Sequence, residues 1–146
     1  MRIPFLIGRL VVGGFFLYNG INHFRNRGHM KQYVASKKVP LPDAAVLASG
    51  IALMVGGGSI LLGIKPKYGA AAIIGFLATV SPVMHDFWNA APEQQSGEMI
   101  NFMKNMALLG AVLSMLGVEE PWPAAVPVAQ PGPMQKAARF VHKLAA

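Results

Sequence analysis

Residues 44–64, AAVLASGIALMVGGGSILLGI, decide the fold, because this run contains no charged side chain. An α-helix needs about 20 predominantly apolar residues to cross the roughly 30 Å hydrocarbon layer of a bilayer. The run does not alternate between apolar and polar side chains, as a strand of a membrane barrel does. Because backbone groups in lipid must be hydrogen-bonded within their own segment, the run predicts a membrane-spanning helix.

Three further apolar runs accompany it, at about residues 3–22, 68–88 and 99–118. The first run is interrupted only by Arg9 and ends without a small-residue cleavage site, so we expect an uncleaved helix rather than a signal peptide. Together the four runs predict an all-α fold, an integral membrane four-helix bundle that occupies residues 1–118.

The composition of the whole chain agrees with this prediction. Of its 146 residues, 53% are hydrophobic and only 13% are charged, with a mean hydropathy of +0.43. Soluble domains carry about 25% charged residues. There is no cysteine, which excludes disulfides, thiol nucleophiles and Cys-ligated metal centres. We therefore expect a multi-pass protein of the inner (cytoplasmic) membrane.

The sequence changes character after the fourth apolar run. Residues 119–134 are rich in proline, which is typical of an extended, semi-rigid linker. Residues 135–146, QKAARFVHKLAA, return to a helical spacing of apolar and basic side chains. This pattern predicts a short amphipathic helix at the end of a Pro-rich C-terminal tail.

The net charge of +7 comes from 13 Lys and Arg against 6 Asp and Glu. Most of these cations lie in the loop between the first two spans, at the span ends and in the tail. Such a distribution suits a bilayer with anionic headgroups. Attraction to these headgroups stabilises each Lys or Arg near the surface by about 1 kcal/mol. It gives no indication of a nucleic-acid partner.

Polar side chains are expected to gather at one end of the bundle. The first and third spans cross the membrane in the same direction, and the fourth begins on the side where they end. This topology brings together Asn19, Asn22, His23, His85, Asp86, Trp88, Asn101, Lys104 and Asn105. Within this set, Asp86 and Lys104 form a natural ion pair, and Trp88 suits the membrane interface.

Several interpretations of this polar end are open. It is a structural rim of side chains bonded to one another, or a quinone pocket in which His23 or His85 bonds a carbonyl and Asp86 relays a proton. Haem ligation by the two histidines is less favoured, because both lie at helix ends that would enclose a macrocycle poorly. Ion binding lacks support, since only one carboxylate is near. We expect no metal site and no catalytic constellation.

Arg9 lies within the first span, where an unpaired arginine is unfavourable by about 2.5–3.5 kcal/mol. It either snorkels and bonds backbone carbonyls or contacts an anion or a quinone carbonyl. The candidate cofactor-binding residues, for a quinone or another polar ligand, are thus Arg9, His23, His85, Asp86, Lys104 and Asn105.

Taken together, residues 5–118 resemble the DoxX family of small four-helix membrane proteins. The clearest resemblance is HDFW at 85–88 followed by FMKNMALLG at 102–110, which look like the H-x-F-W and F-x-K-N-x-A-L-x-G signatures of the family. The first and second spans add further matches: Arg9-Leu10, Gly13, Phe16, Asn19-Gly20, Gly56-Gly57 and Leu62-Gly63. The family often carries a glutamate shortly before the paired glycines, whereas this chain has Ile51-Ala52-Leu53-Met54.

The resemblance implies association with quinone-linked oxidation and membrane oxidoreductase complexes, often as a non-catalytic partner. We therefore expect an accessory subunit of a larger membrane redox or energy-transducing complex, in contact with other membrane subunits. The alternatives are a quinone-interacting oxidoreductase component and a stand-alone membrane stress or transport protein.

Overall fold

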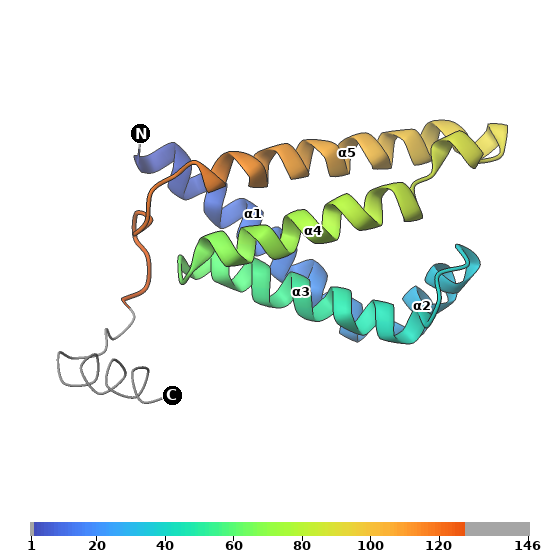
Figure 1. Ribbon diagram of the computed structural model, residues 1–146, viewed down its shortest axis with the longest axis horizontal. Coiled ribbons are helices and arrows are strands. Elements are labelled where there is room, and N and C mark those ends of the chain that lie inside the picture. The colour runs from blue at the N-terminus through green and yellow to red at the C-terminus, as the bar shows by residue number, and fades with distance from the viewer. Residues whose placement is uncertain (1, 128–146) are drawn as a thin grey trace, which may run out of the picture.

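The computed structural model describes residues 2–127, and five α-helices and one 3-10 helix make up its regular structure (Figure 1). In chain order these are α1 (Arg2–Arg25), α2 (Arg27–Ser36), α3 (Pro42–Leu62), α4 (Pro66–Met84), η1 (Phe87–Asn89) and α5 (Pro92–Leu116). Four of the helices, all except α2, are long and apolar enough to cross a membrane. The prediction of an all-α four-helix membrane bundle is confirmed. The amphipathic helix predicted for residues 135–146 lies outside the described residues.

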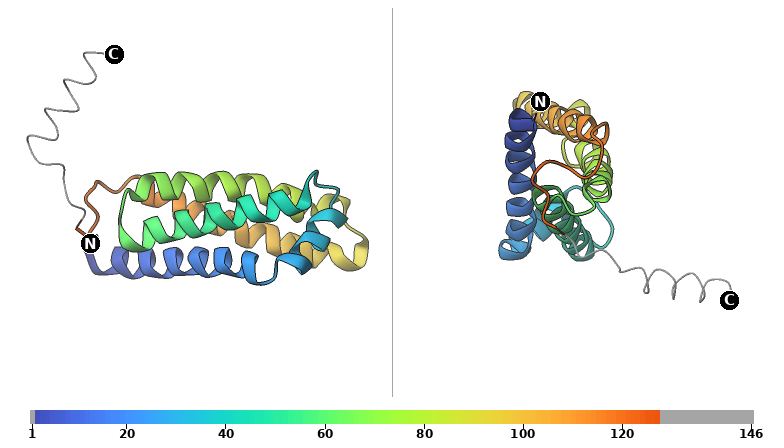
Figure 2. Two further views of the ribbon diagram at one scale, coloured as in Figure 1. Left: turned by 90° about the horizontal axis from the view of Figure 1, so that it is seen from below. Right: turned by 90° about the vertical axis from the view of Figure 1, so that its left-hand side faces the viewer.

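The four long helices lie side by side along the length of the molecule (Figure 2). Helix α1 packs most extensively on α3, α3 packs on α4, and α4 packs on α5. Direct contacts between α1 and α5 are few. The bundle is therefore closed on three sides and loosely joined along its fourth, between α1 and α5.

Two helix boundaries differ from those predicted. Helix α4 ends at Met84 instead of continuing to residue 88, and the chain turns at His85 into η1. Helix α5 begins seven residues before the predicted start (99 − 92 = 7), with Pro92 in its first turn. Proline suits the first helical turn because its missing N–H needs no partner there. The apolar run marked only the membrane-embedded part of α5, whereas its polar first turns also form helix.

Helix α2 was not predicted, because its sequence RGHMKQYVAS lacks a long apolar run. Its apolar side chains Met30, Tyr33 and Val34 nevertheless follow the i, i+3, i+4 spacing of one helical face. That face lies over the inside of the bundle, where all three side chains line a cavity. Tertiary packing therefore supports a helix that the local sequence only weakly favours.

Glycines allow α1 and α3 to approach each other closely. A Cβ atom at Gly57 would lie 2.4 Å from the backbone N of Leu17, and one at Gly20 would lie 2.6 Å from the backbone N of Met54. In lipid, helices associate largely through such close backbone packing. The core of the bundle is formed by buried apolar side chains from α1, α3, α4 and α5, which include Phe16, Leu53, Ile60, Ile73, Leu77 and Val112.

The chain after α5 folds back over the end of the bundle where α1 begins (Figure 1). Trp122 is only 2% exposed and packs edge-on against Phe5, with ring centroids 5.1 Å apart. The N–H of Val126 donates to the carbonyl of Leu62 at 2.9 Å. The described part of the Pro-rich stretch therefore packs on the bundle, because Trp122 supplies an apolar anchor that the extended linker predicted from proline content does not take into account.

Candidate functional site

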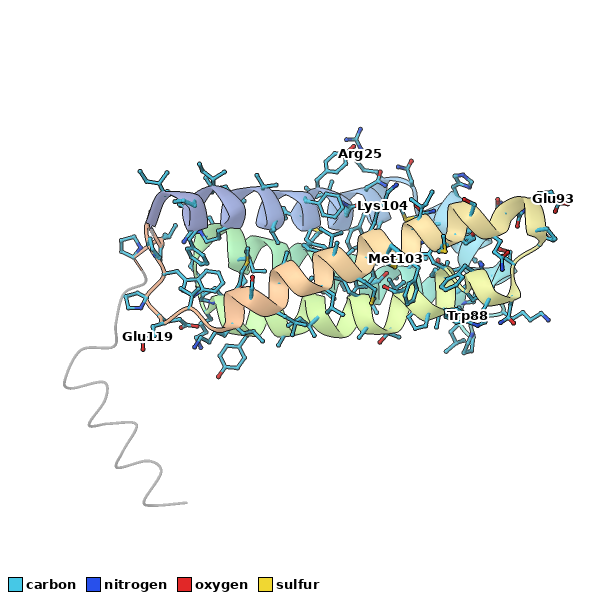
Figure 3. All side chains as sticks on the ribbon, turned by 90° about the horizontal axis from the view of Figure 1, so that it is seen from above. Arg25, Trp88, Glu93, Met103, Lys104 and Glu119 are labelled. Atoms are coloured by element: carbon cyan, nitrogen blue, oxygen red, sulfur yellow. The ribbon has the colours of Figure 1, made fainter. Side chains whose placement is uncertain are left out.

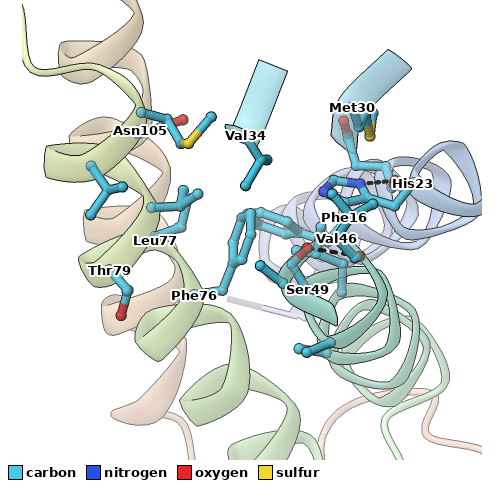
Figure 4. Close-up of a pocket in the computed structure, with 18 of the residues that line it drawn as sticks. Phe16, His23, Met30, Val34, Val46, Ser49, Phe76, Leu77, Thr79 and Asn105 are labelled. Atoms are coloured by element: carbon cyan, nitrogen blue, oxygen red, sulfur yellow. Dashed lines mark hydrogen bonds between the residues drawn. The ribbon is translucent and has the colours of Figure 1, made fainter. Parts of the chain in front are cut away.

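A cavity of about 620 Å³ lies inside the bundle, toward the end that carries η1 (Figure 4). All five helices contribute to its wall, which is predominantly apolar and includes Phe16, Val46, Leu53, Phe76 and Leu77. A smaller set of polar side chains also lines it: Asn19, His23, Tyr33, Ser49, Thr79, His85 and Asn105. Cavities of this size and character are typical of sites for small, mainly apolar ligands.

Helix α2 covers the cavity and is held at both ends by ion pairs. At its start, the guanidinium of Arg27 pairs with the carboxylate of Asp43 at the beginning of α3. Just beyond its end, Lys37 Nζ lies 2.7 Å from Asp86 Oδ1, next to the end of α4. These contacts attach α2 to two different spans, so its position depends on both.

The ion pairs also affect the titration of the residues around α2. The hydrogen bond to Asp86 raises the pKa of Lys37, and the hydrogen bond to Asp43 raises the pKa of Arg27. Burial raises the pKa of Tyr33, whose hydroxyl donates to the carbonyl of Met84 at 3.4 Å. Lys37 and Arg27 therefore stay cationic, and Tyr33 stays a neutral donor, at neutral pH.

The sequence predicts an ion pair between Asp86 and Lys104, but Asp86 pairs with Lys37 instead. The predicted topology placed these two residues at the same end of the bundle, and the structure agrees that they lie there. Helix α2, however, places Lys37 next to Asp86, so the carboxylate of Asp86 pairs with Lys37. Lys104 instead lines a second cavity of about 640 Å³, together with Asn101, Asn105 and His85.

His23 has a defined tautomer because of its position on α1. Its Nδ1 lies 2.8 Å from the backbone carbonyl of Asn19, one helical turn earlier (Figure 4). A carbonyl oxygen only accepts, so Nδ1 carries the proton and donates. In the neutral imidazole the other nitrogen, Nε2, is therefore an acceptor. His23 thus offers an acceptor to a hydroxyl or, once protonated, a donor to a carbonyl.

His85 is oriented by a carboxylate that sequence reasoning missed. Its Nδ1 lies 2.8 Å from Glu98 Oε2, and both side chains are about one-fifth exposed. Glu98 comes within reach because α5 begins at Pro92 and carries the residue in its second turn. The sequence signal that could have identified Glu98 is its position between the polar first turns of α5 and the apolar run that follows. His85 lies on the wall of both the 620 Å³ cavity and the one that Lys104 lines.

Arg9 stands apart from the other predicted site residues. It lies 14 residues before His23 on α1 (23 − 9 = 14), which is about 21 Å along the helix. Its side chain is 2% exposed and donates to the backbone carbonyls of Pro123 at 2.7 Å and Ala124 at 3.1 Å. Arg9 thus binds the folded-back chain after α5 and does not reach the cavity.

The remaining five predicted residues do come together. His23, His85 and Asn105 line the 620 Å³ cavity, Lys104 lines the 640 Å³ cavity, and Asp86 joins α2 to the end of α4. Within residues 2–127 no three His, Asp or Glu side chains lie close enough to hold a metal ion. The arrangement is that of an apolar pocket with a few oriented hydrogen-bonding groups.

Four apolar helices of membrane-spanning length around such a pocket define an integral membrane helix-bundle protein. The DoxX family model matches residues 5–86, and the chain belongs to the DoxX family. It is 27% identical over 108 residues to inner membrane protein YphA of Escherichia coli (strain K12). These aligned residues cover 74% of this chain and 77% of that protein. No solved structure matches. The protein is a multi-pass protein of the inner membrane.

Proposed function

We propose that this protein binds the headgroup of a membrane quinone in the 620 Å³ cavity, as an accessory subunit of a larger membrane redox complex. The observation that carries the proposal is the cavity itself, an apolar chamber with His23, His85 and Asn105 on its wall. A quinone ring is flat and apolar on its faces and has a hydrogen-bond acceptor at each end. The cavity offers the matching combination of aromatic surface and separated polar groups.

The flat ring would find its apolar contacts on Phe16 and Phe76, which both line the cavity. Phe76 also packs edge-on to the ring of His23, with centroids 6.4 Å apart. The loosely joined seam between α1 and α5 supplies a route for an isoprenoid tail to reach the bilayer. A quinone could therefore enter from the membrane without first crossing water.

The two histidines supply the proton chemistry that a quinone requires. Oxidation of a quinol to a quinone releases two protons and two electrons. His23 Nε2 accepts a hydrogen bond from a quinol hydroxyl, and the carboxylate of Glu98 fixes the orientation of the His85 ring on the cavity wall. The electrons would pass to a redox group of a partner subunit, since the chain has no cysteine to hold an iron–sulfur cluster.

The quinone proposal predicts a change in affinity when His23 is replaced by alanine. Loss of one hydrogen bond, worth about 1–1.5 kcal/mol, should weaken binding of a short-chain quinol by about fivefold to tenfold. Calorimetric titration in detergent micelles or nanodiscs measures this. The matched control is His29→Ala, because His29 is exposed on α2 and lines neither cavity. Equal affinities for the wild type and His23→Ala would contradict the assignment.

The accessory role is tested by purification from the native membrane in a mild detergent. On a native gel the protein should migrate with larger partners, and quinone should be extracted from the same band. Migration only as a monomer or homodimer would count against an accessory subunit. A Soret absorbance band in the purified protein would instead favour haem bound by the two histidines.

A further inference from the structure

Lys104 is a cation placed inside the membrane-embedded part of α5. Glu98, which is level with His85 at the polar end, lies six residues earlier (104 − 98 = 6). Lys104 is therefore about 9 Å further into the bundle along the helix. Figure 3 shows its side chain between α1 and α5, at the side where these helices are loosely joined.

Three other cations near the spans have identified partners, whereas Arg25 and Lys67, at the ends of their spans, have none among residues 2–127. Arg9 donates to two carbonyls, Arg27 pairs with Asp43, and Lys37 pairs with Asp86. For Lys104 no hydrogen bond or ion pair is found among residues 2–127, although its side chain is exposed. A lysine charge at membrane depth is unfavourable unless the side chain reaches the interface or meets an anion, so Lys104 is a candidate contact for an anionic group.

The groups around Lys104 are suited to an anion. The 640 Å³ cavity between α1 and α5 is lined by Lys104 and by the side-chain amides of Asn101 and Asn105, which can all donate. Phe15 of α1 and Leu108 of α5 provide the apolar part of the wall. Two carboxylates at this end of the bundle are already engaged, Asp86 by Lys37 and Glu98 by His85. The unpaired Glu93 lies 11 residues before Lys104 on α5 (104 − 93 = 11), which is about 16 Å along the helix.

We propose that the cleft between α1 and α5 binds an anionic phospholipid, with the headgroup phosphate at Lys104, Asn101 and Asn105. The cleft is open toward the bilayer, where such lipids are the abundant anions. The flexible side chain of Lys104 can extend toward the interface and meet the phosphate there. One acyl chain would then lie along Phe15 and Leu108 and fill the seam that the helices leave open.

A second copy of the chain fits this cleft less well than a lipid. A symmetric dimer through α5 would bring each Lys104 toward its own counterpart, and like charges repel. Within the described residues, Asp43, Asp86 and Glu98 are each paired inside the chain, and the unpaired carboxylates lie in the first turn of α5 (Glu93) or beyond its end (Glu119 and Glu120), not level with Lys104. Charge complementarity thus favours a lipid anion over self-association.

The test is retention of lipid by the full-length protein, measured by native mass spectrometry from a neutral detergent. Phosphatidylglycerol and phosphatidylcholine with the same acyl chains are compared, because both carry the phosphate but only phosphatidylglycerol has a net negative headgroup, the choline cation neutralising the other. We expect the wild type to retain phosphatidylglycerol about fivefold to tenfold better, and Lys104→Gln to lose this preference. The matched control is Lys31→Gln, since Lys31 is exposed on α2 near the same end and lines neither cavity.

Two results would overturn the proposal: equal retention of both lipids by the wild type, or an unchanged preference in Lys104→Gln. Oleate that displaces phosphatidylglycerol at equal concentration would instead assign the cleft to a free carboxylate. If Lys104→Gln does not fold, a photoactivatable phosphatidylglycerol on the wild type decides the matter, because labelling must fall on α1 and on residues 101–108. Quinone affinity is measured separately and does not enter this test.

Discussion

Replacement of Gly57 by alanine is expected to destabilise the bundle by about 3 kcal/mol, the upper part of the range for overpacking. The added Cβ would lie 2.4 Å from Leu17 N, 2.9 Å from Gly13 O and 2.9 Å from Phe16 C. All three atoms belong to the backbone of α1, so no flexible side chain can move aside. Helices α1 and α3 would have to separate along the most extensive contact of the bundle.

The matched control is Gly58→Ala, one residue further along α3. A Cβ at Gly58 meets nothing within 4 Å, so this variant should be as stable as the wild type or slightly more stable. Unfolding in a mixed-micelle titration with a denaturing detergent measures both variants against the wild type. Equal midpoints for Gly57→Ala and Gly58→Ala would show that α1 and α3 do not approach as closely as described.

The second large effect is expected for Trp122→Ala, which should destabilise the fold by about 3–5 kcal/mol. Trp122 is 2% exposed, packs edge-on against Phe5, and donates its indole N–H to the carbonyl of Val118 at 3.3 Å. Its truncation leaves a cavity beside the buried guanidinium of Arg9. The neighbouring carbonyls of Pro123 and Ala124 would then lose their fixed position opposite that cation.

Trp88 provides the control for this prediction. It is the other tryptophan of the chain and is 51% exposed, at the opposite end of the bundle from Trp122. Trp88→Ala should therefore change the free energy of unfolding by less than about 1 kcal/mol. The same titration compares the two variants. A Trp122→Ala protein as stable as Trp88→Ala would mean that the chain after α5 contributes nothing to the fold.

Because Trp122 anchors the segment that Arg9 binds, its replacement should also affect Arg9. If the chain after α5 is displaced, the guanidinium loses both carbonyl partners at membrane depth. Arg9→Leu should accordingly be less harmful in the Trp122→Ala background than in the wild type. A double-mutant cycle measures this coupling, which is expected to exceed about 0.5 kcal/mol because both side chains hold the same segment, Trp122 by its own packing and Arg9 through Pro123 and Ala124.

The sequence by itself determined the four spans. Apolar runs of about 20 residues have one stable solution in lipid, the helix, whatever their neighbours are. It also predicted correctly that His23, His85 and Asn105 lie at one end of the bundle, because alternating helix direction places their span ends together. These features depend on local composition and chain order alone.

Only the tertiary structure decided which charges meet. Asp86 binds Lys37 in place of Lys104 because α2, a helix with no long apolar run, folds over the cavity and carries Lys37 to the end of α4. Arg9 finds Pro123 and Ala124 because a single buried tryptophan draws the Pro-rich chain back over α1. Such pairings join residues far apart in the sequence, so they depend on packing that no local pattern encodes.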